Sequence, residues 1–161
     1  MNTDVSPSEF RLLKQILEQG YSRKAWHGPN LRQSLRGVSA RHAAWRPAPG
    51  RHNIWEVAVH AAYWKYALRR KLRGEKRGSF SLKGSNWFTR PANGITDEKA
   101  WREDLALLDQ EHQKLLDAVA GMAAGKTGKI PSHFIFGVAF HDVYHAGQIR
   151  LLRRLRARGE H

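Results

Sequence analysis

The chain has 161 residues, of which 41% are hydrophobic and 26% are charged, and it contains no cysteine. This length and composition suit a single compact domain over residues 1–161. The lack of cysteine excludes a disulfide framework, thiolate zinc sites and a cysteine nucleophile, so a bound metal needs nitrogen or oxygen ligands. The first ten residues lack the features of a signal peptide, and no run approaches the roughly 20 apolar residues of a membrane span. These features predict a cytoplasmic protein without membrane contact.

The formal net charge of +14 is concentrated in two basic runs, residues 65–77 and 150–158. Such runs have two interpretations: the footprint of a nucleic acid or acidic partner, or solvated cations that complement the C-terminal ends of helices. Proteins that bind single strands by stacking interleave aromatic with basic residues, and in these runs only Tyr66 does so. We therefore favour the solvated surface, with nucleic-acid binding that is weak and non-specific.

Hydrophobic periodicity predicts four long helices. The first opens at Pro7 and Ser8 and ends within residues 21–26. Its apolar residues recur every three or four positions, as on a face that packs against a core: Phe10, Leu13, Leu17 and Tyr21. Gly28 and Pro29 then break the chain. A short helix at residues 31–35 and a turn at residues 47–50 lead to the second long helix.

The second long helix begins after Asn53, which can cap it, with Glu56 three residues on as in a capping box. Its apolar face consists of Ile54, Val57, Ala61, Trp64 and Leu68, and His60 lies one residue from this stripe. The following stretch, residues 74–94, is polar but contains Trp87 and Phe88. It is longer than most connections in compact domains, which indicates a mobile loop or a lid.

The third helix is predicted to begin at Thr96 as its capping residue. Its apolar stripe has heptad spacing, with His112 in the one slot that lacks an apolar residue: Trp101, Leu105, Leu108, Leu115, Val119 and Met122. The fourth helix starts at Pro131 and runs to about Arg158, with Phe134, Val138, His141, His145, Ile149 and Leu152 on one face. Four long helices without a strand pattern predict an all-α fold, an antiparallel-type four-helix bundle whose connectivity stays open.

The pattern with the clearest chemical content is the pair His141 and His145. A separation of four residues places two imidazoles one above the other on the same helix face, close enough to bind one ion. Burying two imidazoles on an apolar stripe is costly unless each finds a partner, and a shared cation satisfies both. His60, in the middle of the second helix, completes a triad if it faces the bundle axis. For this pair considered without His60, the alternative to metal binding is that two histidines fall four residues apart by chance.

Several segments resemble the DinB-like (YfiT-like) superfamily of DNA-damage-inducible proteins, which is unrelated to the polymerase of the same name. The segments are HNIWEVAVHAAYWKYALRRKL (residues 52–72), HDVYHAGQIRLLRRL (residues 141–155), AWHGPNLRQSLRGV (residues 25–38) and the WRPAPG turn (residues 45–50). The most specific part is the His-x3-His-x2-Gln element that starts at His141. The resemblance covers most of the chain.

The resemblance implies a four-helix bundle, usually dimeric, that holds a divalent ion, often nickel or zinc. The ligands are one histidine of the second helix and two of the fourth, which match His60, His141 and His145. Three imidazoles leave a coordination position open, where a water or a substrate thiol is acidified. Relatives of this fold include transferases and isomerases that use mycothiol or bacillithiol, so the resemblance implies thiol activation on a small-molecule substrate.

Residues close to the triad in sequence have a functional and a structural interpretation. Trp64 and Gln148 are candidate pocket residues, and their alternatives are core packing for Trp64 and a bond to a neighbouring helix for Gln148. His112 is either a fourth ligand or a hydrogen-bonded core histidine, and the second is favoured. Asp142 and Tyr144 flank the ligands but point away from them, which favours a surface or interface role.

Three functions are compatible with these features. The first is a metal-dependent enzyme that activates a thiol or water for transfer or hydrolysis. The second is a metal-binding stress protein without turnover, and the third is a basic nucleic-acid-associated protein. We favour the first and assign no catalytic side chain. An open metal position with exchangeable water indicates an enzyme, a closed fourth ligand such as His112 indicates a structural ion, and salt-sensitive DNA binding indicates the third class.

Overall fold

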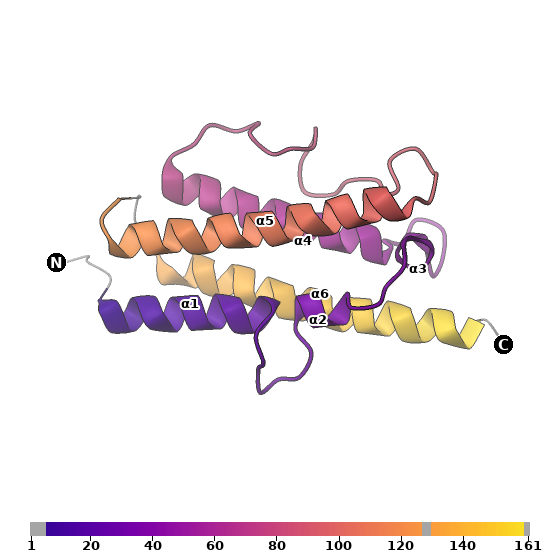
Figure 1. Cartoon of the computed structure of the whole chain (residues 1–161), viewed down its shortest axis with the longest axis horizontal. Helices are drawn as coiled ribbons and strands as arrows, with labels where there is room; N and C mark the ends of the chain where they lie inside the picture. The colour runs from indigo at the N-terminus through magenta and orange to yellow at the C-terminus, as the bar shows by residue number, and fades with distance from the viewer. Residues whose placement is uncertain (1–5, 127–129, 160–161) are drawn as a thin grey trace.

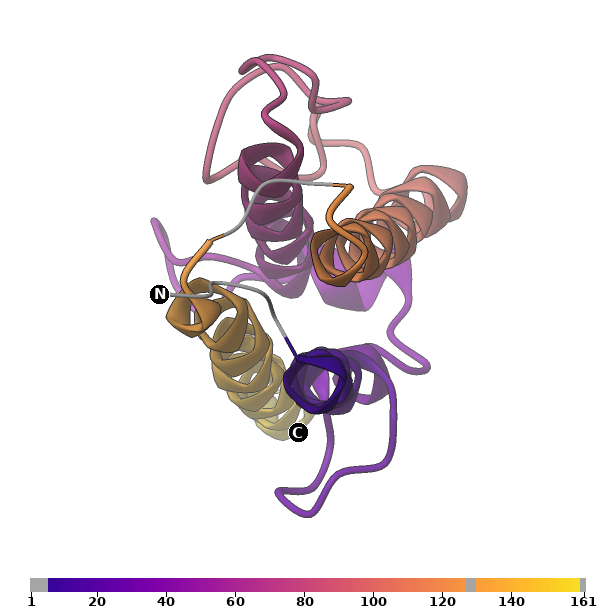
Figure 2. The ribbon, with the colours of Figure 1, turned by 90° about the vertical axis from the view of Figure 1, so that its left-hand side faces the viewer.

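The structure is a computed structural model that describes residues 6–126 and 130–159, and over those residues it contains helices and no strands. The helices are α1 (Pro7–Tyr21), α2 (Leu31–Ser34), α3 (Ala40–Ala44), α4 (Ile54–Arg73), α5 (Glu98–Ala123) and α6 (Ser132–Gly159). The all-α prediction is confirmed. The four long helices α1, α4, α5 and α6 lie along the long axis and form a four-membered bundle in the end view (Figure 1, Figure 2). No helix in the described ranges is long and apolar enough to cross a membrane.

The helix directions settle the connectivity. Helices α4 and α5 point the same way, and α1 and α6 both point the opposite way (Figure 1). Side-chain contacts agree, because Trp55 packs near Trp101 at the starts of α4 and α5 and Arg69 bonds to Glu111 farther along both helices. Residues 74–97, which join α4 to α5, therefore return along the length of the bundle, and we call them the crossover loop.

Local sequence determines most helix ends. The side chain of Asn53 caps α4 by accepting a hydrogen bond from the backbone amide of Glu56, as predicted. The cap of α5 is Asp97 and not Thr96, because the Asp97 carboxylate accepts from two backbone amides of the first turn. The five-residue helix α3, which apolar periodicity does not indicate, is capped by Ser39.

The core consists of two apolar clusters with a buried polar layer between them. One cluster lies where α2, α3 and the starts of α4 and α5 meet, and the other lies between α1, the start of α6 and the far ends of α4 and α5. In the polar layer, Lys65 of α4 donates to Asp142 of α6, and both side chains are fully buried. Arg69 of α4 donates to Glu111 of α5. These two ion pairs tie α4 to α5 and α6.

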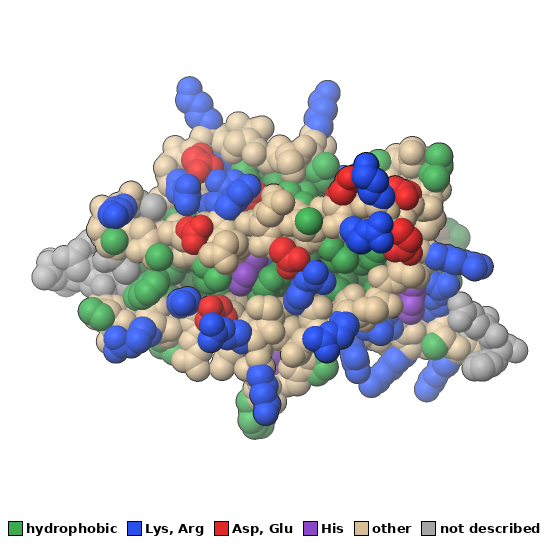
Figure 3. Space-filling view, in the orientation of Figure 1, with side chains coloured by type: hydrophobic (Ala, Val, Ile, Leu, Met, Phe, Trp, Pro, Cys, Tyr) green, Lys and Arg blue, Asp and Glu red, His purple; other side chains and the backbone are tan. Residues whose placement is uncertain are grey.

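The polar layer corrects the interpretation of the first basic run. Lys65 and Arg69 are 0% and 6% exposed, so the prediction that the run is a solvated face is wrong for these two residues. Their charges are already paired inside the bundle, which also removes them from any nucleic-acid footprint. On the face seen in Figure 3, acidic side chains stand among the exposed basic ones rather than apart from them. The net charge is therefore spread over a mixed surface on this face.

Candidate metal centre

Three imidazoles from two helices meet inside the bundle. His60 comes from the middle of α4, and His141 and His145 lie one turn apart on α6. The Nε2 atom of His141 is 3.0 Å from the Nε2 atom of His60 and 3.0 Å from that of His145. One nitrogen of each ring lies within 4.8 Å of the other two, and no other such group occurs among the residues that the structure describes. The three histidines that the sequence singles out are brought together.

Hydrogen bonds on the far side of two rings determine where their protons lie. His60 Nδ1 is 2.8 Å from the backbone oxygen of Asn86, and His145 Nδ1 is 2.6 Å from Oε1 of Gln148. A carbonyl oxygen only accepts hydrogen bonds, so both Nδ1 atoms carry the proton and both Nε2 atoms present lone pairs to His141. The Nε2 atom of His141 can donate a proton to only one of them. A cation shared by the three rings is attracted by every lone pair, so the donor set fits a metal.

The electrostatics of the site keep the rings neutral. Burial lowers the pKa of all three histidines, to about 3 for His141 and about 4 for His145. The neighbouring imidazoles contribute to these low pKa values of His141 and His145, because a second positive charge at this distance is repelled. At neutral pH the three rings are therefore neutral, and a neutral imidazole is the state that binds a metal.

The crossover loop covers the triad and contributes residues that the sequence did not assign to the site. Trp87 is stacked between His52 and His60, with ring centroids 3.6 and 3.8 Å away and nearly parallel planes. Asn86 adopts a positive φ of 63°, and its carbonyl accepts the proton of His60. The loop, expected to be mobile or a lid, is anchored by Phe88, which is buried in the core. An aromatic residue in a polar loop was the one sequence signal for this role.

Both candidate pocket residues lie beside the triad. Trp64 is 41% exposed, its ring meets those of His60 and His141 edge-on at 6.4 and 6.3 Å, and its Nε1 donates to the side chain of Asn86. Gln148 accepts from His145 and donates from Nε2 to the hydroxyl of the exposed Tyr144. Gln148 thus bonds within α6 and orients a triad ring, rather than bonding to a neighbouring helix.

Two other candidates lie away from the triad. His112 stacks on Tyr21 at 3.9 Å between ring centroids and is outside the three-histidine group, so it is a core histidine. Its predicted hydrogen bonds are absent, because neither ring nitrogen has a partner among the described residues. Asp142 is fully buried against Lys65, so the surface or interface role is wrong. One residue after His141, a helix has turned by about 100°, which directs Asp142 into the polar layer.

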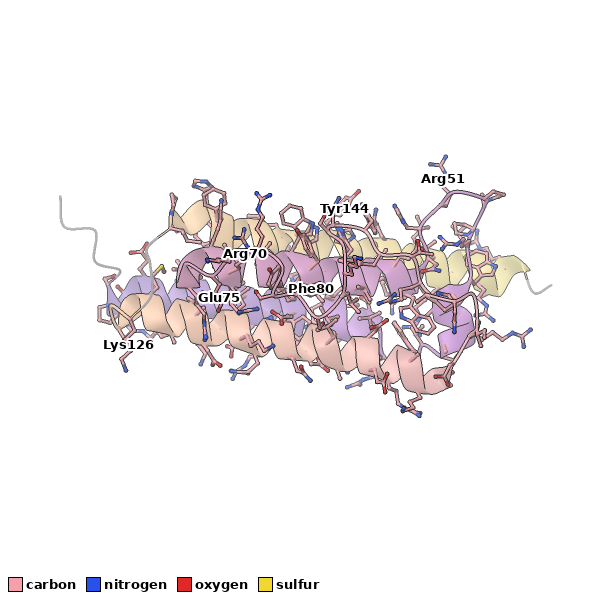
Figure 4. All side chains as sticks on the ribbon, turned by 90° about the horizontal axis from the view of Figure 1, so that it is seen from above. Arg51, Arg70, Glu75, Phe80, Lys126 and Tyr144 are labelled. Carbon is pink, nitrogen blue, oxygen red and sulfur yellow. The ribbon has the colours of Figure 1, made fainter. Side chains whose placement is uncertain are left out.

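A cavity of about 850 Å³ opens next to the triad. Its walls come from α4, the start of α6 and the crossover loop, and Trp64 borders both the cavity and the histidines. Arg70 and Phe80, which line it, lie over α4 in Figure 4, whereas Tyr144 lies over α6. The site thus consists of a three-histidine cluster and an adjacent cavity, and Trp64 is in contact with both.

Comparison with known protein families identifies the superfamily of the chain. A family model described as the DinB superfamily matches residues 25–149, a range that contains all three histidines and the crossover loop. No curated protein and no solved structure matches the chain significantly.

Proposed function

Since the chain belongs to the DinB superfamily, we propose that it is a divalent-metal-dependent enzyme whose metal ligands are His60, His141 and His145. The observation that carries the proposal is the convergence of three Nε2 atoms, at least two of which present lone pairs to a common point. Nickel and zinc are the proposed ions, because a site made of imidazole nitrogens suits them better than it suits magnesium or calcium. The reaction we propose is transfer or hydrolysis with a thiol or water as nucleophile.

When bound, the ion supplies Lewis acidity that lowers the pKa of a thiol or water at its open coordination position. The protein residues have three separate tasks. His60, His141 and His145 hold the ion, while the Asn86 carbonyl and the Gln148 amide orient two of the rings through their Nδ1 protons. Hydrogen bonds of this kind raise the basicity of the ligand and fix its tautomer.

The third task is to exclude water from the site. Trp64 and Trp87, which lie beside the triad, perform this task. Trp87 covers His60 on one face and Trp64 meets it edge-on. A site with apolar walls strengthens electrostatic interactions inside it. Trp87→Ala is therefore expected to weaken metal binding without removing a ligand.

The direct test is metal content of protein purified without a histidine tag and measured by plasma emission. The wild type should hold close to one ion per chain, and His141→Ala should hold far less, because two imidazoles bind an ion less well than three. His133→Ala is the matched control, since His133 is an exposed histidine two turns earlier on the same helix. Equal metal content in all three proteins would contradict the proposal. A screen for thiol transfer, with His141→Ala as the inactive control, then tests the reaction.

A metal-binding protein without turnover is the second candidate, and one observation favours it. The three ligands come from two helices, so an ion bound to them ties α4 to α6 and stabilises the fold by mass action. Both functions predict a rise in melting temperature with metal, so the thiol-transfer screen separates them: a protein that metal stabilises but that reacts with no thiol supports the structural ion.

We propose that the chain forms a homodimer through α6. This helix exposes a row of large apolar side chains spaced by four, seven and four residues: Phe140, Tyr144, Leu151 and Leu155. Exposed apolar rows of this kind mark interaction surfaces. The same face in a second copy provides a matching apolar surface, as a two-fold symmetric interface requires.

A further inference from the structure

We propose that the cavity beside the triad binds the substrate of the metal centre, and that this substrate is an amphipathic anion with an apolar body and an acidic group at its far end. The assignment of the reacting end rests on the proposed function. The affinity for an amphipathic anion rests on the cavity alone.

The position of the cavity connects it to the triad. On α4, Trp64 lies one turn after His60, and on α6, Val138 lies about one turn before His141. Both residues line the cavity. The hollow therefore begins one helical turn from two of the three ligands, and the ring of Trp64 packs against both of these histidines.

Five of the seventeen residues that line the cavity are aromatic. They are Tyr63, Trp64, Tyr66, Phe80 and Phe134, of which Trp64 and Phe134 are 41% and 40% exposed. Large aromatic side chains that border a hollow offer a binding surface for apolar groups. The volume of about 850 Å³ falls within the range of roughly 300–1,000 Å³ that small-molecule sites occupy.

The charge of the lining has one sign. Arg70, Lys71, Arg77 and Lys83 line the cavity, and none of the residues in its lining is acidic. Lys71 Nζ lies 4.6 Å from the ring centroid of Phe134, so the cationic and aromatic walls adjoin. A hollow lined by cations with apolar walls attracts anions and focuses the field on them. The lining therefore selects an acidic ligand that also has an apolar part.

The helix sets the length of the ligand. Arg70 is ten residues after His60 on α4, which is about 15 Å along the axis, and its guanidinium donates to the backbone oxygen of Glu75 just beyond the end of the helix. The acidic group should thus lie about 15 Å from the reacting end. A single amino-acid thiol is too short for this span.

Two fluorescent probes with similar aromatic bodies test the charge selectivity: 1-anilinonaphthalene-8-sulfonate, which is anionic, and N-phenyl-1-naphthylamine, which is neutral. The test variant is Arg77→Gln/Lys83→Gln, which removes two lining charges. Its matched control is Arg73→Gln/Lys76→Gln, which removes two exposed charges of the same region that do not line the cavity. We expect about a tenfold loss of affinity for the anionic probe in the test variant at low salt, and changes below about twofold for the neutral probe and for the control. Equal losses in both variants overturn the inference.

The connection to the metal needs a readout of distance. Protein loaded with Co²⁺ should enhance the relaxation of the protons of the bound anionic probe relative to protein loaded with Zn²⁺. Full metal occupancy without this enhancement overturns the assignment of the cavity to the metal centre. Failure of the proposed function is seen separately, because the wild type then binds no metal. The affinities of the test and control variants for the two probes still report on the cavity in that case.

Discussion

Replacing Lys65 by methionine removes the positive member of the ion pair between α4 and α6 and should destabilise the fold severely. Both Lys65 and Asp142 are 0% exposed, and Asp142 Oδ1 has no hydrogen-bond partner among the described residues even with Lys65 in place. The variant therefore leaves a buried carboxylate without its only partner. Breaking a buried pair in this way costs about 3–5 kcal/mol of the free energy of unfolding. Burial already raises the pKa of Asp142 to about 6.

A second variant separates the loss of the pair from the loss of one partner. Lys65→Met/Asp142→Leu removes both charges and fills the space with apolar atoms, so it should recover to within about 2 kcal/mol of the wild type. The surface control is Lys99→Met, because Lys99 and Glu103 form an ion pair whose side chains are 79% and 65% exposed. That change should cost at most about 0.5 kcal/mol.

The assay is urea unfolding at pH 7.5 in the presence of a chelator, so that no bound metal contributes to the difference between variants. Lys65→Met should lower the midpoint sharply, and the double variant should regain most of it. A loss below about 1 kcal/mol in Lys65→Met, or a double variant less stable than Lys65→Met, would refute the argument from burial.

Three further predictions follow from the fold and the surface. Burial lowers the pKa of His112 to about 2. Below about pH 6.5 the unfolded chain therefore binds a proton that the folded chain does not, and the folded state loses stability. Between pH 7.5 and pH 5 this lowers the free energy of unfolding by about 2 kcal/mol. His112→Phe keeps a ring against Tyr21, so the free energy of unfolding measured in urea titrations should lose that part of its pH dependence. An unchanged pH dependence contradicts the prediction. Leu151→Glu should convert a dimer into a monomer in light scattering while Arg150→Glu does not, and a monomeric wild type at micromolar concentration removes the interface. DNA binding should be lost by physiological salt, and a submicromolar complex that survives this salt without metal would reverse the ranking of enzyme above nucleic-acid binder.

The helices and the histidine cluster follow from local sequence patterns. Apolar spacing predicts the four long helices, and the four-residue separation of His141 and His145 places both rings on one face. The position of His60 beside an apolar stripe indicates which way its helix turns it. These inferences succeed because a helix fixes the relative directions of residues a few positions apart.

The features that the sequence did not indicate depend on contacts between distant segments. Lys65 looks like one more cation in a basic run, and only the packing of α6 against α4 brings Asp142 to it. Asn86 and Trp87 lie in a loop without periodicity, so no local pattern connects them with His60. The parallel direction of α4 and α5 is likewise set by the path of the crossover loop, which has no helical spacing to read.

Because of the path of the crossover loop, substitutions in the loop and substitutions in the helices have different consequences. A helix the length of α4 spans about 30 Å, whereas the 24 residues between Arg73 and Glu98 would reach about 80 Å if extended. The excess length lets the loop fold into one wall of the cavity and still pass over the triad. Substitutions within the loop can therefore alter what the cavity accepts, while the two helices that carry the histidines keep their packing. In this architecture the lining of the cavity can change while the three histidines stay the same.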